Sequence, residues 1–246
     1  MSQSGHPALS AAYRPAGNTT AEARSGPAAR VQAVVFDMDG LLVDSEPVWF
    51  QAESAVMTRL GGTWTPGDQH VLVGGSLATT VSHLLAKAAQ PAEPADVARW
   101  LIEAMVGLLA SHPLRALPGV LDLLDEVRAA GLPHALVTSS EPAIVEAVLA
   151  RLDVTFEVVV CAADVAATKP DPEGYLLAAA KLGADPAQSI ALEDSSNGVA
   201  AAEAAGYRVV AVPSVVPVPA RSGLVVLPTL AGVTLGQLAA LTGLPG

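Results

Sequence analysis

The sequence predicts an α/β fold, a doubly wound and Rossmann-like parallel sheet that is interrupted by an inserted all-helical subdomain. Short runs of apolar residues recur at 33–36, 135–137, 158–161, 190–192 and 209–212. Such runs are typical of strands that are covered on both faces. Helical patterns lie between most of the runs, and strands that alternate with helices favour parallel pairing. A long interval with helical patterns but no convincing strand indicates the insertion.

The helices of the sheet domain are predicted from apolar residues spaced three and four positions apart. Val120, Leu123, Leu124 and Val127 fall on one face, and Gly131 follows as a helix stop. Comparable patterns occupy 144–152, 175–182 and an alanine-rich segment near 199–206. Each would cover one face of the sheet.

The predicted insertion spans residues 46–115 and would form a helical cap. Trp49, Ala52, Val56, Met57 and Leu60 share one helical face, and Trp100, Leu101, Ala104, Met105 and Leu108 share another. Residues 31–45 and 116–246 would then form the α/β core. Residues 1–30, rich in small residues and without a continuous apolar run, are expected to be a flexible tail rather than a secretory signal.

Composition restricts the classes of partner. The formal net charge of the 246 residues is -11, which disfavours nucleic acid and anionic membranes as partners. No stretch reaches the roughly 18 apolar residues that a membrane span requires. Cys161 is the only cysteine, so a disulfide framework is impossible. We therefore expect a cytoplasmic protein that acts on a small molecule; its oligomeric state stays open, and a monomer is compatible with the sequence.

Polar residues follow four of the predicted strands. Asp37 and Asp39 follow the first strand in the order Asp-Met-Asp-Gly, and Thr138-Ser139-Ser140 follows the second. Lys169 comes after the third, and Glu193-Asp194-Ser195 follows the fourth. Each group alone has an ordinary reading: a polar turn, a solvated lysine, or helix capping by Asp194 or Ser195. Because ligands bind at the carboxyl ends of parallel strands, the four together predict one site.

These segments resemble the haloacid dehalogenase-like (HAD) hydrolase superfamily, in the branch with a helical cap after the first strand (C1). The resemblance spans roughly residues 34–213. It rests on VVFDMDGLLVDSEP (34–47), LVTSS (136–140), TKPDPEGY (168–175) and ALEDSSNGVAAAEAAG (191–206). It implies a Mg²⁺-dependent phosphohydrolase that cleaves a small phosphorylated metabolite, a sugar or polyol phosphate, through an aspartyl-phosphate.

The resemblance also implies roles for individual residues. Asp37 would be the nucleophile and Asp39 the general acid and base. Thr138 and the amide of Ser139 would hold phosphoryl oxygens, and Lys169 would neutralise charge on the phosphate and on Asp37.

The metal would be bound by residues from the first and fourth strands. The resemblance implies Mg²⁺ ligation by the Asp37 carboxylate, the Asp39 carbonyl oxygen and Asp194, with Glu193 acting directly or through water. Ser195 and Asn197 would support this shell from outside.

Other chemistries occur on related scaffolds. A dehalogenase would not be expected to keep an aspartate at position 39. Sugar phosphomutases of the β-phosphoglucomutase type are closer, but they carry a histidine where Trp49 stands and an arginine where Leu77 stands. A non-enzymatic receiver module would place its acidic pair at the first strand. The sequence thus favours a phosphatase, with the mutase as the alternative.

The cap is expected to choose the substrate. Gly74-Gly75-Ser76 is either a cap loop that faces the site or a simple turn between helices. Trp49 and Trp64 could line the entrance, but the sequence favours a structural role for both within the cap.

Overall fold

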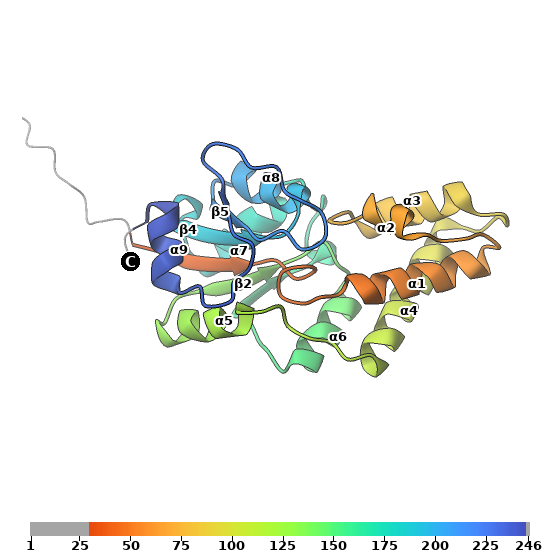
Figure 1. The fold of residues 1–246 in the computed structure, drawn as a ribbon, viewed down its shortest axis with the longest axis horizontal. Coiled ribbons are helices and arrows are strands. Elements are labelled where there is room, and N and C mark those ends of the chain that lie inside the picture. Colours follow the sequence, from red (N-terminus) through yellow and green to blue (C-terminus); the bar gives the residue numbers. More distant parts are fainter. Residues whose placement is uncertain (1–29, 245–246) are drawn as a thin grey trace, which may run out of the picture.

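The computed structural model describes residues 30–244, which form a six-stranded sheet and a group of helices at one end of it (Figure 1). The strand order is β3-β2-β1-β4-β5-β6, and every neighbouring pair is parallel. The strands are β1 (Ala33–Phe36), β2 (His134–Val137), β3 (Val158–Val160), β4 (Ser189–Glu193), β5 (Arg208–Ala211) and β6 (Val225–Val226). The connections reverse direction at β1, so a ligand site is expected at its carboxyl end.

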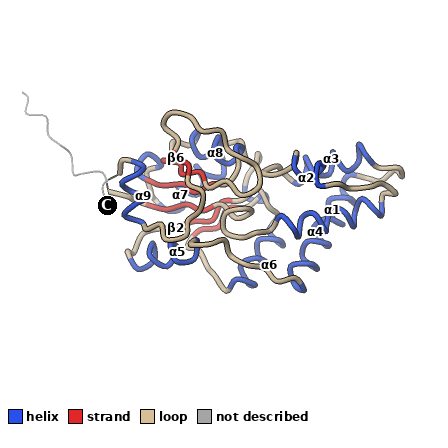
Figure 2. The backbone as a smooth tube through the Cα atoms, in the orientation of Figure 1, coloured by secondary structure: helices blue, strands red, loops and turns tan. Residues whose placement is uncertain are grey.

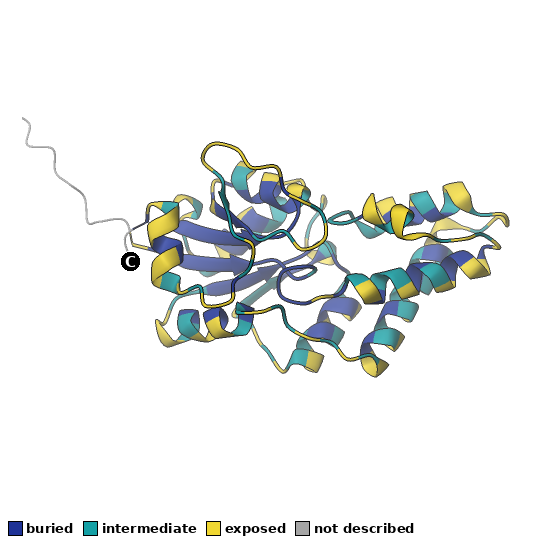
Figure 3. Cartoon of the chain, in the orientation of Figure 1, coloured by how far each residue is buried: buried dark blue, intermediate teal, exposed yellow. Residues whose placement is uncertain are grey.

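Helices cover both faces of the sheet, as the predicted doubly wound fold requires. Phe36 and Leu136 pack on one face with α5 (Val120–Ala129), α6 (Pro142–Leu152) and α9 (Leu235–Thr242). Val35 and Ala135 pack on the other with α7 (Glu173–Leu182) and α8 (Ser196–Ala204). Successive strand residues point to opposite faces, so strands between two layers must be apolar throughout. Figure 3 shows these strands as buried.

The insertion is helical, as the sequence predicts. It contains α1 (Glu46–Arg59), α2 (Pro66–His70), α3 (Leu77–Lys87) and α4 (Pro94–Ser111), which Figure 2 shows beside the sheet. The C-terminal half of the predicted α1 face is buried with residues of α3 and α4, in a cluster of Val56, Met57, Leu60, Val81, Leu84, Val97 and Leu101. Ala52 and Trp49 of that face pack in the cluster of the α/β core instead. This group of helices is called the cap below. It has an apolar cluster of its own, while Met105 and Leu109 of α4 pack in the core cluster together with Phe36.

The two chain connections to the cap lie side by side. Val43 forms an antiparallel bridge with Ala116, and the Leu117 amide donates to the Leu42 carbonyl oxygen at 3.1 Å. The pairing lies close to the predicted division at 45/46 and 115/116, which stays a prediction. The predicted tail, 1–30, lies outside the described residues except for Arg30.

The sequence did not predict β6 and α9. β6 is only two residues long and half-buried, and α9 has eight residues, so neither carries a strong periodic pattern. The predicted strands differ from the observed ones by one residue at several ends, as at His134, which begins β2. Two short 3₁₀ turns, η1 (Ala162–Asp164) and η2 (Pro186–Gln188), complete the described elements. No helix among the described residues has the length and apolar character of a membrane span.

Candidate active site

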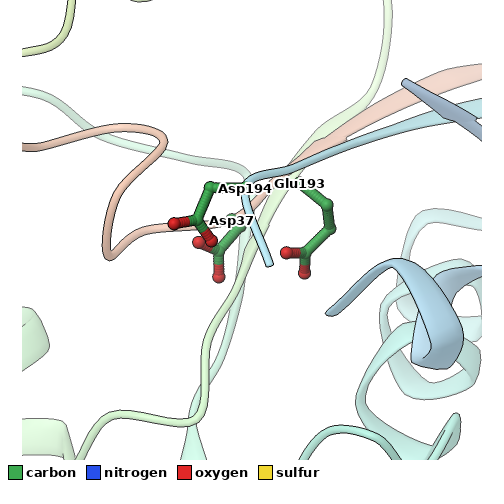
Figure 4. A group of neighbouring side chains, drawn as sticks. All are labelled: Asp37, Glu193 and Asp194. Carbon is green, nitrogen blue, oxygen red and sulfur yellow. The ribbon is translucent and has the colours of Figure 1, made fainter. Parts of the chain in front are cut away.

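Three buried carboxylates meet at the carboxyl ends of the two central strands (Figure 4). Asp37 directly follows β1, Glu193 ends β4, and Asp194 comes next. β1 and β4 are paired in register, with Phe36 opposite Leu192, so their ends coincide. One oxygen of each carboxylate lies within 4.8 Å of the others. The parallel pairing therefore brings together residues that are about 156 positions apart in the chain.

Lys169 lies against this carboxylate cluster. Its Nζ contacts Asp37 Oδ1, lies 2.6 Å from Glu193 Oε1 and donates to the Val137 carbonyl oxygen at 2.8 Å. The Tyr175 hydroxyl also donates to Glu193 Oε1, at 2.5 Å. Burial lowers the pKa of Lys169, but the Asp37 and Glu193 carboxylates outweigh it and raise that pKa, so the ammonium stays charged. The Glu193 carboxylate is thus bound by Lys169 and Tyr175, and Figure 4 shows it beside Asp37 in the same group of carboxylates.

The cluster carries more negative than positive charge. Three carboxylates face one ammonium group, and burial raises the pKa of Asp37 well above its usual value. Burial, and then the charge of Glu193, raise the pKa of Asp194 to about 7. Oxygen donors with surplus negative charge are what a hard divalent cation requires. Glu193 Oε2 is buried and has no hydrogen-bond partner among the described residues. The donor set therefore fits a divalent metal ion.

Close packing around Asp194 explains Gly40 in the first motif. Gly40 has φ +82°, and a Cβ at this position would overlap the Asp194 carboxylate. The Ser214 hydroxyl donates to Asp194 Oδ2 at 2.7 Å. Ser214 and Tyr175 were not predicted from the sequence as site residues. Tyr175 lies inside a quoted motif, whereas Ser214 follows β5 in a loop with no recognisable signal.

Asp39 points away from the cluster, toward the cap and β2. Its Oδ1 accepts hydrogen bonds from the Ser45 hydroxyl at 2.6 Å and from Trp49 Nε1 at 3.1 Å. Its Oδ2 accepts from the Ser140 hydroxyl at 2.7 Å and from the Thr138 hydroxyl at 3.4 Å. The structure thus gives Trp49 a place at the site, although the sequence favoured a purely structural role. The indole nitrogen reaches Asp39 because α1 begins right beside the first motif.

Ser139 has a free hydroxyl at the same cavity. Its Oγ is buried and has no hydrogen-bond partner among the described residues, and Ser139 lines the cavity together with Thr138 and Lys169. An unpaired buried hydroxyl is costly unless a ligand or water meets it. This position suits an oxygen atom of a bound anion next to Lys169.

The cavity lies between the core and the cap. Its floor is formed by core residues that include Asp37, Asp39, Thr138, Ser139 and Lys169. The cap side is lined by Glu46, Trp49, Glu53, Gln69, Leu72, Val73, Gly74, Gly75, Ser76, Leu77 and Thr80. Gly74-Gly75-Ser76 is therefore a cap loop that faces the site, which was one of the two predicted alternatives. Trp64 lies behind this lining, where its Nε1 donates to Glu53 at 3.0 Å.

The cap loop is docked on the core by Asn197. The Asn197 side-chain amide donates to the Gly74 carbonyl oxygen at 3.0 Å, and Gly74 has φ +71°. Ser195 caps α8, because its hydroxyl accepts a hydrogen bond from the Gly198 amide at 3.1 Å. Of the two capping residues that the sequence left open, the structure therefore selects Ser195. Asn197 contacts the cap rather than the carboxylates.

Two glutamates of the cap line the cavity, and neither was predicted from the sequence as a site residue. Glu53 is only 3% exposed, and burial raises its pKa to about 7, with an opposing contribution from Trp64. Burial also raises the pKa of Glu46 to about 7, helped by the charges of Asp39, Glu53 and Asp44. Their position in α1 is visible in the sequence, but which helical face meets the site is not.

Replacing Glu53 by glutamine will stabilise the protein at alkaline pH. The folded pKa is above the ordinary 4.5, so the stability contribution of Glu53 is lost as pH rises from about 4.5 to about 7. We expect Glu53→Gln to exceed wild type by about 1–3 kcal/mol in unfolding free energy at pH 8 and to equal it at pH 4. Urea unfolding at both pH values measures this, with the exposed Glu146→Gln as control. If the unfolding free energies of Glu53→Gln and wild type differ by the same amount at both pH values, the ionisation of buried Glu53 does not cost stability.

Comparisons with known proteins agree with the fold. Residues 31–206 match the family model described as haloacid dehalogenase-like hydrolase. Protein CbbY of Rhodobacter capsulatus is 36% identical over 196 residues, which cover 75% of this chain and 86% of that protein. Hexitol phosphatase B of Escherichia coli K12 is 35% identical over 190 residues, which cover 75% of this chain and 85% of that protein.

A solved structure shares the whole architecture. CbbY from Rhodobacter sphaeroides, as a mutant in complex with xylulose 1,5-bisphosphate, matches with a TM-score of 0.78 and 28% identity, over 85% of this chain and 99% of that one. The family match covers most of the described residues, including Asp37, Lys169 and Asp194. The chain belongs to the haloacid dehalogenase-like hydrolase family.

Proposed function

We propose that this chain is a Mg²⁺-dependent phosphatase that cleaves a sugar or polyol phosphate through an aspartyl-phosphate on Asp37. The observation that carries the proposal is the buried contact of Lys169 with Asp37, next to Asp194 and at the floor of a cavity closed by the cap. A lysine at this position offsets the charge of both nucleophile and phosphate. The relatives that are phosphatases of phosphorylated carbohydrates support the substrate class.

In the first step, a carboxylate oxygen of Asp37 forms a bond to phosphorus while the bond from phosphorus to the ester oxygen breaks. The departing oxygen takes a proton from Asp39 and leaves as an alcohol. In the second step, water attacks the phosphorus of the aspartyl-phosphate and gives a proton to Asp39. Inorganic phosphate leaves, and the Asp37 carboxylate is restored.

The surrounding residues hold the phosphoryl group and exclude water. The hydroxyl of Thr138 and the amide of Ser139 would donate to phosphoryl oxygens, beside the ammonium group of Lys169. The hydroxyls of Ser45 and Ser140 and the indole of Trp49 orient Asp39 toward the leaving group. The cap covers the reacting atoms and keeps bulk water away from them.

Mg²⁺ would be held by Asp37, the Asp39 carbonyl oxygen and Asp194, and it would supply positive charge for the phosphoryl oxygens. Because Glu193 Oε1 contacts Lys169 and Tyr175, we assign Glu193 to the support of Lys169 and to metal binding through water.

Removal of divalent metal tests this proposal. We expect EDTA to lower phosphate release from sorbitol 6-phosphate by at least about a hundredfold, and excess Mg²⁺ to restore it. Mg²⁺ should also raise the melting temperature of the wild type, because it binds the folded state. Added Mg²⁺ should leave the melting temperature of Asp194→Asn unchanged. Full activity in chelator would contradict the metal assignment.

The mutase remains the alternative, and two positions favour hydrolysis over it. Trp49 donates to Asp39 where mutases carry a histidine, and Leu77 lines the cavity where they carry an arginine. Incubation with glucose 1-phosphate and a bisphosphate primer should therefore release phosphate without forming glucose 6-phosphate. We place the reaction in the cytoplasm, with a small phosphorylated metabolite as partner.

A further inference from the structure

The two ends of the active-site cavity have opposite chemistry. The floor carries Lys169, together with the hydroxyls of Thr138 and Ser139, and suits a phosphate. The cap end carries Glu46 and Glu53, two carboxylates that lie seven residues, or about two helical turns, apart on one face of α1. A substrate bound across the cavity must therefore present an anion to the floor and a different group to the cap.

The cap end offers hydrogen-bond acceptors. Gln69 donates its side-chain amide to the Glu46 carbonyl oxygen at 2.7 Å and to Glu46 Oε2 at 2.9 Å. Trp64 donates to Glu53 Oε2. These bonds hold both glutamates and occupy the side-chain donors of Gln69 and Trp64, while Glu46, Glu53 and Gln69 all line the cavity. A hydroxyl group is the ligand group that such acceptors recognise.

The cap end lacks a partner for a second phosphate. Among the described residues that line the cavity, Lys169 is the only one with a lysine or arginine side chain, and it is already in contact with Asp37 and Glu193. The other lining residues near the cap loop are apolar or neutral, such as Leu72, Val73 and Leu77. A phosphate at this end would meet like charges in a partly desolvated space.

We propose that the substrate carries a single phosphate on a hydroxylated carbon chain, and that Glu46 and Glu53 both bind its hydroxyl groups and reject bisphosphates. The inference rests on the proposed function and adds a charge filter to it. It separates this chain from CbbY of Rhodobacter sphaeroides, which binds xylulose 1,5-bisphosphate. The filter acts by repulsion, so specificity comes from exclusion as well as from fit.

Substrate comparison at pH 8 with Mg²⁺ tests the inference. The probes are sorbitol 6-phosphate, fructose 1,6-bisphosphate, hexyl phosphate and p-nitrophenyl phosphate. We expect kcat/KM for sorbitol 6-phosphate to exceed the values for fructose 1,6-bisphosphate and for hexyl phosphate by at least about tenfold. The second phosphate of the bisphosphate is repelled by the cap carboxylates, and hexyl phosphate lacks hydroxyl groups for them to bind.

Two sets of variants test whether charge at the cap end causes the preference for a monophosphate. Glu46→Gln combined with Glu53→Gln should raise the ratio of bisphosphate to monophosphate kcat/KM by about tenfold, whereas the exposed Glu146→Gln should not change it. Leu77→Arg should raise the same ratio by supplying a cation in the cavity, and Leu77→Gln, which adds length without charge, should not. Circular dichroism on each variant confirms that it is folded.

The outcomes separate the inference from the proposed function. If kcat/KM for the bisphosphate is within twofold of the value for sorbitol 6-phosphate, the charge filter is wrong, but the proposed phosphatase function is still supported. If hexyl phosphate matches sorbitol 6-phosphate, hydroxyl recognition is wrong. A ratio that stays constant in both sets of variants likewise overturns the roles of Glu46 and Glu53. If no probe, p-nitrophenyl phosphate included, releases phosphate, the proposed function itself fails.

Discussion

Asp37→Asn will lower phosphate release by at least about a thousandfold, because an amide oxygen cannot form the aspartyl-phosphate. The fold should be unaffected or slightly more stable. Asparagine has the same shape, and the change removes one of three carboxylates that crowd a buried site, where burial already raises the pKa of Asp37. Phosphate release under saturating Mg²⁺, together with the melting temperature, measures both effects.

The matched control for this prediction is Asp125→Asn. Asp125 lies on α5 with 75% of its side chain exposed, so its replacement should change neither activity nor stability appreciably. Turnover of Asp37→Asn within tenfold of wild type would exclude Asp37 as the nucleophile. A large drop in melting temperature would show that lost activity reflects lost structure.

Asp39→Asn will make the rate depend on the leaving group. Without a proton donor, an alkyl phosphate must expel an alkoxide, and turnover of sorbitol 6-phosphate should fall by about 10²–10⁴-fold. p-Nitrophenyl phosphate has a far better leaving group and should still transfer its phosphoryl group to Asp37. Water attack on the aspartyl-phosphate then lacks its base and becomes slow.

Rapid mixing measures this prediction. We expect a burst of about one equivalent of nitrophenol per enzyme from Asp39→Asn, followed by slow turnover. Ser45→Ala, which removes one of the hydroxyls bound to Asp39, should reduce the rate for both substrates by a similar and smaller factor. An equal loss for both substrates in Asp39→Asn, without a burst, would show that Asp39 is not the acid.

Much of the fold could be predicted because central parallel strands are covered on both faces. The segment AVVF of β1 is buried at every position, and such a run is recognisable without knowledge of its neighbours. α1 and α4 could be predicted in the same way, since their apolar faces repeat at helical spacing. β6 could not, because it has two residues at the edge of the sheet, where few positions must be apolar. α9 could not, because eight residues are too few for a clear helical period, although Leu238 and Ala239 are buried in the core.

The sequence by itself determined the order of the four segments that carry polar site residues, and the places of three of them directly at strand ends. Asp37 and Asp194 could be selected from one chain because a strand followed by a charged turn is a local pattern. Lys169 lies nine residues beyond β3, so only the motif around it marked it as a site residue. Only the tertiary structure decided what each side chain contacts. Trp49 reaches Asp39, Glu193 turns to Lys169 and Tyr175, and Glu53 faces the cavity. These contacts join segments distant in the chain, or depend on the rotation of a helix about its axis. Local periodicity carries no information on such contacts. Packing within the α/β core sets those of Glu193, and packing of the cap on the core sets those of Trp49 and Glu53.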